Sequence, residues 1–201
     1  MRLFGRLTCA SMLLWLSFGG IPAASPTFAE LIDGDFFDDF DDYSDGMSLH
    51  QPNGQPVNGW KAWDNDYSYV ACVTSDFASS PPHSVAIYPT TDLIHEFATV
   101  GGGQYVFTAD TYFPSVSTGS PYFIMLNTYN DVGGGSKNWS LQEVFNHTSG
   151  MVENANGLND IDTPIIYDEW VPIRVVIDLD ADTQTFSYGE TTLFSDKSWT
   201  E

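Results

Sequence analysis

The stretch EWVPIRVVIDLDADTQTFSYGETTLF, residues 169–194, has the clearest strand pattern in the chain, and the fold prediction rests on it. Every second residue from Val171 to Leu179 is aliphatic, and in an extended chain these side chains share one face. The run from Asp180 to Thr183 favours a tight turn, and the aromatic run after it restarts a strand that ends before Gly189. The stretch therefore predicts a half-buried strand, an acidic turn and a returning strand, with one more short strand after the glycine.

Similar strand patterns recur along the chain between glycine, proline and asparagine clusters, and helical periodicity is almost absent. No internal repeat is visible, which argues against a propeller. The chain is therefore predicted to be all-β, as a sandwich or a closed barrel. The expected strands are Tyr67–Val73, Ser84–Tyr88, Leu93–Phe97, Gln104–Phe113, Tyr122–Tyr129, Trp139–Phe145, Trp170–Leu179, Thr185–Tyr188 and Thr191–Phe194.

The order of tryptophan, long strand, acidic turn, aromatic strand and glycine resembles the return hairpin of concanavalin A-like (LamG-like) jelly rolls of secreted lectins and glucanases. The acidic opening from Asp38 to Leu49, the tryptophan-rich segment from Asn58 to Asn65 and the segment from Ser79 to Ile87 resemble the same fold. The resemblance implies a two-sheet antiparallel β-sandwich over most of the chain. It implies no single activity, because this fold serves lectins, hydrolases, lyases and adhesion modules.

One departure from the family pattern concerns the end of the chain. Jelly rolls of this type close a sheet with a last strand beside the first, whereas this chain stops at Glu201, soon after the hairpin. The resemblance therefore implies that residues 30–201 form a single jelly-roll domain that is C-terminally incomplete. A first strand without its closing neighbour would have an unpaired edge.

The N-terminus predicts export. Arg2 and Arg6 precede an apolar run from Leu7 to Ile21, and Thr27 and Ala29 are small residues at the two positions that a signal peptidase reads. We expect residues 1–29 to be a cleaved signal peptide, because the apolar run is shorter than the roughly 20 residues that span a bilayer. The mature protein is then secreted or attached to the cell surface.

The charge of the mature chain limits its partners. Two of the six cations leave with residues 1–29, so four remain against all 27 acids. Nucleic acid and anionic membrane both require a cationic surface and are excluded as partners, and acidic polysaccharides are disfavoured. Cys72 is then the only cysteine, which rules out an intramolecular disulfide and leaves packing to stabilise the fold.

Catalysis is not expected from the carboxylates. Retaining glucanases of this fold carry Glu-x-Asp-x-x-Glu on one strand, and none of the seven glutamates begins that pattern. His95 and Glu96 are neighbours on an expected strand and point to opposite faces, so they form no acid/base pair. A lyase of the same fold needs cations to neutralise a uronate, and the mature chain has few.

Neutral sugars suit the composition better. Pyranose rings stack their C–H faces on tryptophan and tyrosine, and short polar side chains bind their hydroxyls. The segments around Trp60 and Trp63, and around Asn127, Tyr129 and Trp139, combine both kinds of residue. We predict these five residues as sugar contacts, although packing in the sandwich is the competing role for each tryptophan.

Arg174 is the sixth predicted contact. It lies opposite the core face of its strand, and in so acidic a chain it pairs with a carboxylate, either for structure or at the floor of a binding face.

Calcium is a further prediction. Asp178 to Asp182 resembles the start of an EF-hand loop, but its sixth position is Thr183 and its twelfth is Gly189, so we interpret it as a hairpin turn. The acidic opening is the better candidate, with Asp39 and Asp41 on one side of an extended chain as Ca²⁺ ligands. A solvated acidic segment is the alternative.

Three functions remain after these exclusions. The first is a carbohydrate-binding or adhesion module that recognises a neutral glycan or a cell-surface polysaccharide without catalysis. The second is a structural extracellular sandwich domain with no small ligand, and the third is a polysaccharide-cleaving hydrolase or lyase with unconventional residues. The first is favoured.

Overall fold

A computed structural model describes residues 36–97, 100–131 and 135–200, and nearly all regular structure within them is β. The predicted signal peptide lies outside these ranges. Inside them, no helix has the length and apolar character needed to cross a membrane.

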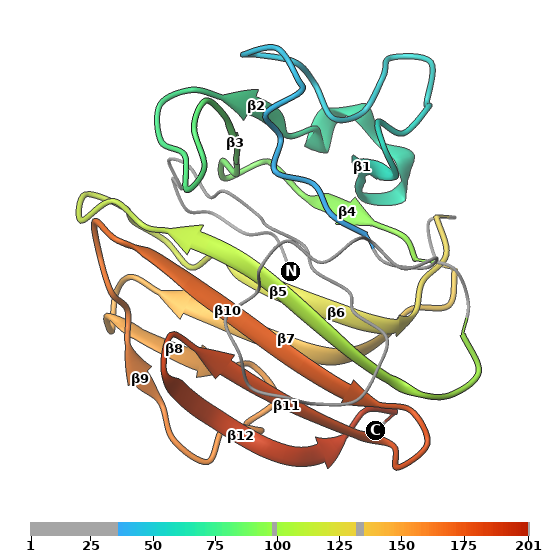
Figure 1. Ribbon diagram of the computed structural model, residues 1–201, viewed down its shortest axis with the longest axis vertical. Helices are drawn as coiled ribbons and strands as arrows, with labels where there is room; N and C mark the ends of the chain where they lie inside the picture. Colours follow the sequence, from blue (N-terminus) through green and yellow to red (C-terminus); the bar gives the residue numbers. More distant parts are fainter. Residues whose placement is uncertain (1–35, 98–99, 132–134, 201) are drawn as a thin grey trace.

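The main body is a sandwich of two four-stranded antiparallel sheets, which lie one against the other in Figure 1. The first sheet has the order β12-β11-β10-β5 and the second the order β6-β7-β8-β9. The strands of the first sheet are β5 (Gln104–Tyr112), β10 (Trp170–Asp178), β11 (Thr183–Tyr188) and β12 (Thr191–Ser198). Those of the second are β6 (Tyr122–Thr128), β7 (Asn138–Asn146), β8 (Met151–Asn154) and β9 (Thr163–Pro164). The predicted antiparallel β-sandwich is confirmed, and its kinship with jelly rolls stays a prediction.

The hairpin of β10 and β11 forms as its sequence predicts. The alternate residues Val171, Ile173, Val175 and Ile177 are buried, whereas Arg174 is exposed. Asp178 closes the acidic turn, because its Oδ1 accepts the backbone N–H of Asp180 at 3.0 Å and of Ala181 at 2.8 Å. Gly189 follows β11 with φ of +57°, a conformation that glycine adopts without steric cost.

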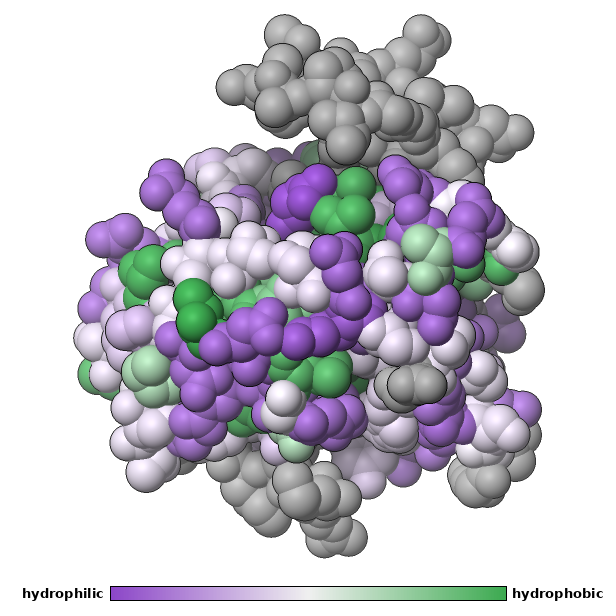
Figure 2. Space-filling model, turned by 90° about the horizontal axis from the view of Figure 1, so that it is seen from below, coloured by the Kyte–Doolittle hydropathy of each residue, from purple (hydrophilic) through white to green (hydrophobic). Residues whose placement is uncertain are grey.

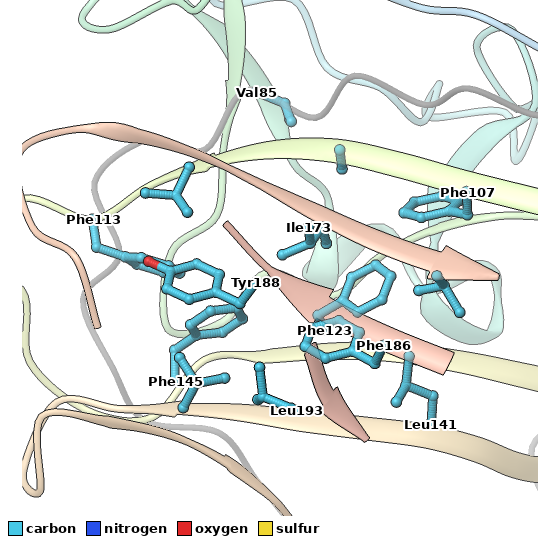
Figure 3. Packing of buried hydrophobic residues seen from close by; sticks show 14 of the residues in the cluster. Val85, Phe107, Phe113, Phe123, Leu141, Phe145, Ile173, Phe186, Tyr188 and Leu193 are labelled. Carbon is cyan, nitrogen blue, oxygen red and sulfur yellow. The ribbon is translucent and has the colours of Figure 1, made fainter. Parts of the chain in front are cut away.

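Aromatic rings from both sheets fill the space between them (Figure 3). Phe123 of β6 lies 5.3 Å from Phe107 of β5 and 6.1 Å from Phe186 of β11, measured between ring centroids. Phe145 of β7 contacts Tyr188 of β11 at 5.5 Å. These rings join the two sheets through apolar contacts, the main source of stability where the described residues form no disulfide.

Residues 36–97, which we call the N-terminal region, lie beside the sandwich where β5 and β6 are edge strands (Figure 1). Two small antiparallel pairs form there: β1 (Trp60–Ala62) with β4 (Leu93–His95), and β2 (Cys72–Thr74) with β3 (Ser84–Ala86). The 3-10 turns η1 (Trp63–Asn65) and η2 (Tyr67–Tyr69) follow β1. One hydrophobic cluster includes buried residues of both the N-terminal region and the sandwich.

The expected strand over Tyr67–Val73 is wrong in its first half. Asp66 accepts the backbone N–H and the hydroxyl of Ser68, at 3.0 Å and 2.7 Å, and this local bonding stabilises η2 instead of an extended chain. Only Cys72 and Val73 of the expected strand belong to β2, which runs to Thr74, and Cys72 is a free thiol.

The opening segment is not a strand either, because a buried carboxylate folds it back on itself. Asp38 is 6% exposed, and its Oδ1 accepts the N–H of Phe40 at 2.9 Å. Its Oδ2 accepts from Tyr43 Oη at 2.7 Å, Asn58 Nδ2 at 3.0 Å and Trp60 Nε1 at 3.0 Å. We call this arrangement the Asp38 hub.

The surface is largely hydrophilic on the face shown in Figure 2, where apolar side chains lie scattered among polar ones. A strongly acidic composition, with 27 acids in the chain, agrees with such a surface.

Candidate functional site

Three aromatic side chains meet where the N-terminal region borders the sandwich. Trp63 begins η1, Tyr129 follows β6 directly, and Trp139 lies near the start of β7. The Trp63 ring is 5.3 Å from the Trp139 ring in a stacked arrangement and 5.0 Å from the Tyr129 ring at an interplanar angle of 62°. All three side chains are partly exposed. We call Trp63, Tyr129 and Trp139 the aromatic cluster.

Local backbone geometry places Trp63 in this cluster. Asp64 and Asn65 both have φ of +54°, the left-handed region that aspartate and asparagine tolerate better than other side chains. The turn is held from two sides, because Trp63 N–H donates to the Asp92 carbonyl at 2.9 Å and Asp64 N–H donates to Tyr129 Oη at 2.9 Å. The second bond ties the N-terminal region to the end of β6.

A β-bulge precedes the buried part of β7 and sets the position of Trp139. The pairing of β6 with β7 shifts at Ser140, which stands as an extra residue between the pairs made by Trp139 and Leu141. Gln184 of β11 reaches across the sandwich and donates from Nε2 to the Ser140 carbonyl at 2.6 Å. Leu141 is fully buried while Trp139 keeps part of its surface exposed.

Lys137 lies over two rings of the aromatic cluster. Its Nζ is 4.8 Å from the centroid of Trp63 and 5.4 Å from that of Tyr129, both within the range of a cation–π interaction. The same ammonium forms an ion pair with the Asp64 carboxylate. Only 12% of the Lys137 side chain is exposed, so two rings and a carboxylate enclose this cation.

Lys61 is the second cation at the cluster. Its Nζ binds Asp131 Oδ2 at 2.6 Å and the Glu96 carboxylate, and it lies 5.7 Å from the Tyr129 centroid. Burial alone would lower the pKa of Lys61, but the hydrogen bonds and charges of Asp131 and Glu96 outweigh burial and raise it. Burial likewise acts to raise the pKa of Asp131, and its contact with Lys61 lowers it overall.

The charges at the cluster nearly balance. Lys61 and Lys137 are two of the four cations outside residues 1–29, and they face Asp64, Glu96 and Asp131. Among these ion-paired groups, the carboxylates exceed the ammonium groups by one. An anionic ligand would meet no unpaired positive charge here, whereas a neutral ring can approach the aromatic faces.

The structure brings together three of the six predicted sugar contacts. Trp63, Tyr129 and Trp139 meet, and neighbouring Asn127 donates from Nδ2 to the Trp199 carbonyl at 3.1 Å. Trp60 does not belong with them: it is 1% exposed, so its ring is unavailable to a ligand.

Arg174 lies on β10 of the opposite sheet, paired in register with Thr108 and Ser187. It is exposed, as predicted, but makes no ion pair with any described residue. The expected acidic partner of Arg174 is therefore not found within residues 36–97, 100–131 and 135–200.

The charged residues at the cluster are not among the predicted site residues. They are Lys61, Lys137, Asp64, Glu96 and Asp131. The positions of the lysines could have indicated these residues. The chain has few cations, yet Lys61 lies between Trp60 and Trp63, and Lys137 lies two residues before Trp139.

The carboxylates of the two predicted calcium ligands, Asp39 and Asp41, accept hydrogen bonds from backbone N–H groups of the protein. Asp39 Oδ1 accepts the N–H of Asp41 at 3.1 Å, and Asp41 Oδ1 accepts the N–H of His83 at 3.1 Å. Among the described residues, no three His, Cys, Asp or Glu side chains gather closely enough to hold a metal ion. A calcium ion at Asp39 and Asp41 would need carbonyl or water ligands, and it stays a prediction.

A second group of polar residues surrounds Glu143 of β7. Its side chain is fully buried, and its carboxylate accepts from Asn154 Nδ2 at 2.5 Å and from Asn159 Nδ2 at 3.3 Å. Burial raises the pKa of Glu143 to about 7, and the charge of Asp162 adds to that effect while the two amides oppose it. A proton donor with this pKa is chemically useful, but a fully buried carboxyl group cannot meet a polysaccharide.

No model of a known protein family matches this chain, and neither does any curated protein or solved structure.

Proposed function

We propose that the protein is a secreted or cell-surface carbohydrate-binding module that recognises a neutral glycan at the aromatic cluster, without catalysis. The observation that carries the proposal is the meeting of Trp63, Tyr129 and Trp139 from three separate segments. All three were predicted as sugar contacts from sequence.

The cluster supplies the chemistry that a sugar ring needs. A pyranose can stack its C–H face on the exposed part of Trp139 while hydroxyls bind polar groups around it. Three polar side chains border the cluster. Asp64 and Asp131 bind its two lysines, and Asn138, which precedes Trp139, is exposed. Because both neighbouring lysines are already paired, the cluster offers an acidic sugar no free cation, whereas a neutral sugar needs none.

Charge also decides among partners outside the cluster. With 27 acids in the chain, nucleic acid, anionic membrane and acidic polysaccharides would be repelled. Export through the predicted signal peptide would bring the module to neutral glycans or to the polysaccharide of a cell surface. The sequence resemblance to lectin-type jelly rolls points in the same direction, as an expectation.

Two variants of the chain beginning at Glu30 provide the test. We expect the unmodified chain to bind at least one neutral oligosaccharide on a glycan array. In titration calorimetry with that oligosaccharide, Trp139→Ala should lose at least tenfold in affinity, because it removes the stacking surface. Repeating the array with EDTA tests whether calcium takes part.

Trp170 offers a matched control. It is a partly exposed tryptophan that contacts Tyr112 at 5.2 Å on the other sheet. Trp170→Ala should change affinity less than twofold. Absence of binding across neutral glycans, or equal affinity of Trp139→Ala and the unmodified chain, would contradict the proposal and favour a structural domain. Release of reducing ends from polysaccharide would favour an enzyme instead.

A further inference from the structure

The contacts of Lys137 describe a small cation-binding enclosure. Its ammonium lies in the corner between the Trp63 and Tyr129 rings, whose planes are 62° apart, at 4.8 Å and 5.4 Å from their centroids. Asp64 supplies a carboxylate to the same nitrogen. Two inclined aromatic faces and one carboxylate are the groups that bind organic ammonium ions in proteins.

The two rings and the carboxylate all contact the ammonium group of Lys137. A lysine ammonium is a compact point charge on a flexible stem, so another ammonium of similar size can take its position. The backbone holds the enclosure independently of Lys137, because Asp64 N–H is bonded to Tyr129 Oη at 2.9 Å. The enclosure can therefore keep its shape when Lys137 moves out.

The surroundings favour a cation as the arriving group. The formal net charge is −21, which attracts cations and repels anions at long range. Three carboxylates face two lysines at the cluster, so a cation that replaces Lys137 leaves the local balance unchanged. Trp139, stacked on Trp63 at 5.3 Å, lies beside the enclosure and can accept the ring that carries the ammonium.

We propose that Trp63, Tyr129 and Asp64 form an ammonium-binding cage that Lys137 fills in the free protein, and that glycans carrying a protonated amino group displace it. Unacetylated hexosamine units are the ligand class that this arrangement fits. The sugar part of this inference rests on the proposed function, because it uses stacking on Trp139, whereas the cage itself does not.

The test compares tetramethylammonium, oligomers of glucosamine and their N-acetylated counterparts. Lys137→Met removes the internal cation and keeps the apolar stem. This variant should bind tetramethylammonium and the glucosamine oligomer at least tenfold more tightly than the unmodified chain does. Tryptophan fluorescence measures the binding. Lys137→Arg retains a cation and should show no gain. Adding Asp64→Asn to Lys137→Met should remove most of the gain.

A second measurement needs no variant. Saturating tetramethylammonium should increase acetylation of Lys137 by acetic anhydride in the unmodified chain, measured by peptide mass spectrometry, while Lys197 reacts equally with and without it. Lys197 pairs with Asp160 and has no aromatic partner among the described residues, which makes it the internal control.

The outcomes separate the two proposals. The cage is wrong if Lys137→Met gains no more affinity for ammonium ligands than for N-acetylated ones and the acetylation of Lys137 is unchanged. That result leaves the binding of neutral glycans at Trp139 unaffected. If ammonium ligands bind as expected but no neutral glycan does, the cage is right and the neutral-glycan proposal fails.

Discussion

The sandwich and the N-terminal region hold their shapes by different means. In the sandwich, β5 and β10 each run for nine residues, and their alternate side chains enter a core built from aromatic rings. In the N-terminal region, all four strands have three residues, and the chain between them turns back repeatedly. Strands so short bury little apolar surface by their own periodicity, so other interactions must define this region.

Side-chain bonds to local groups take that role in the N-terminal region. The Asp38 hub collects four donors, and His50, fully buried, accepts the Ala62 N–H at 3.1 Å. Two of the donor residues, Phe40 and Asn58, have positive φ values, as do Asp64 and Asn65 of the same region. Side-chain hydrogen bonds thus define a loop-rich region whose strands are too short for an alternating apolar pattern. The aromatic cluster lies on the border of this region and the sandwich.

The largest effect should come from removing the Asp38 carboxylate. Asp38→Ala leaves the Trp60 indole N–H buried without an acceptor and frees Tyr43 and Asn58, so we expect a loss of about 3 to 4 kcal/mol in the free energy of unfolding. Urea unfolding measures the loss. Hydrogen exchange should show faster exchange at Leu49 and Val73, whose amides bond within the N-terminal region, before β10 is affected.

Asp42 is the matched control, since it is exposed and close to Asp38 in sequence. Asp42→Ala should change stability by no more than about 0.5 kcal/mol. Equal stability of the two variants would show that the hub does not hold the N-terminal region together.

Glu143 is the exception within the sandwich, where a carboxyl group faces Phe123 and Asn154 across neighbouring strands. Burial raises its pKa from 4.5 to about 7, so the folded state keeps a proton that the unfolded state releases. The stability from this group is full below pH 4.5 and is lost as the pH rises through about 7, a change of about 3 kcal/mol. The unmodified chain should therefore lose about 3 kcal/mol relative to Glu143→Gln between pH 4 and pH 8.

Urea unfolding of both chains across this pH range measures the difference, because all other groups titrate alike in the two. Glu169→Gln, at an exposed site, should follow the unmodified chain within about 0.5 kcal/mol. A difference between Glu143→Gln and the unmodified chain that does not change with pH would mean that folding leaves the pKa of Glu143 at its ordinary value.

The contrast between the regions also explains how much could be predicted from sequence. The strand expected over Trp170–Leu179 is observed as Trp170–Asp178, and Gln104–Phe113 as Gln104–Tyr112, because alternation and burial agree there. Tyr67–Val73 failed because a local Asp66 bond outweighed the β preference of tyrosine and valine. The short strands β1, β8 and β9 were missed, since two to four residues carry no readable period.

The same division holds for the site. Trp63, Tyr129 and Trp139 could be predicted because aromatic residues beside short polar ones are readable in sequence. The burial of Trp60 could not, because it depends on Asp38, 22 residues earlier in the chain. The pairing of Lys61 with Asp131 joins residues 70 apart, and such contacts follow from the tertiary fold alone.

Lys61 provides the smallest and most specific test, because it links the two regions. It belongs to β1 of the N-terminal region and binds Asp131, which lies just beyond β6 of the sandwich. Lys61→Met should cost about 1 kcal/mol at neutral pH, because one partner is well exposed and the other partly so. The raised pKa of Lys61 means that its contribution is present below the ordinary lysine value of 10.5 and is lost as the pH rises through the raised value. The lowered pKa of Asp131 means that the contribution is also lost as the pH falls below 3.8.

The stability difference between the unmodified chain and Lys61→Met should therefore be flat between about pH 5 and pH 9 and should shrink at both extremes. Lys197→Met is the control, because it removes an ion pair of similar length, 2.7 Å to Asp160, that lies outside the N-terminal region. If Lys61 couples the regions, Lys61→Met should make the amides of the N-terminal region exchange faster while those of β10 stay protected. Lys197→Met should not produce this difference. Equal exchange patterns in the two variants would mean that the shared hydrophobic cluster and the other contacts between the regions, such as the Asp64–Tyr129 bond, couple the N-terminal region to the sandwich without Lys61.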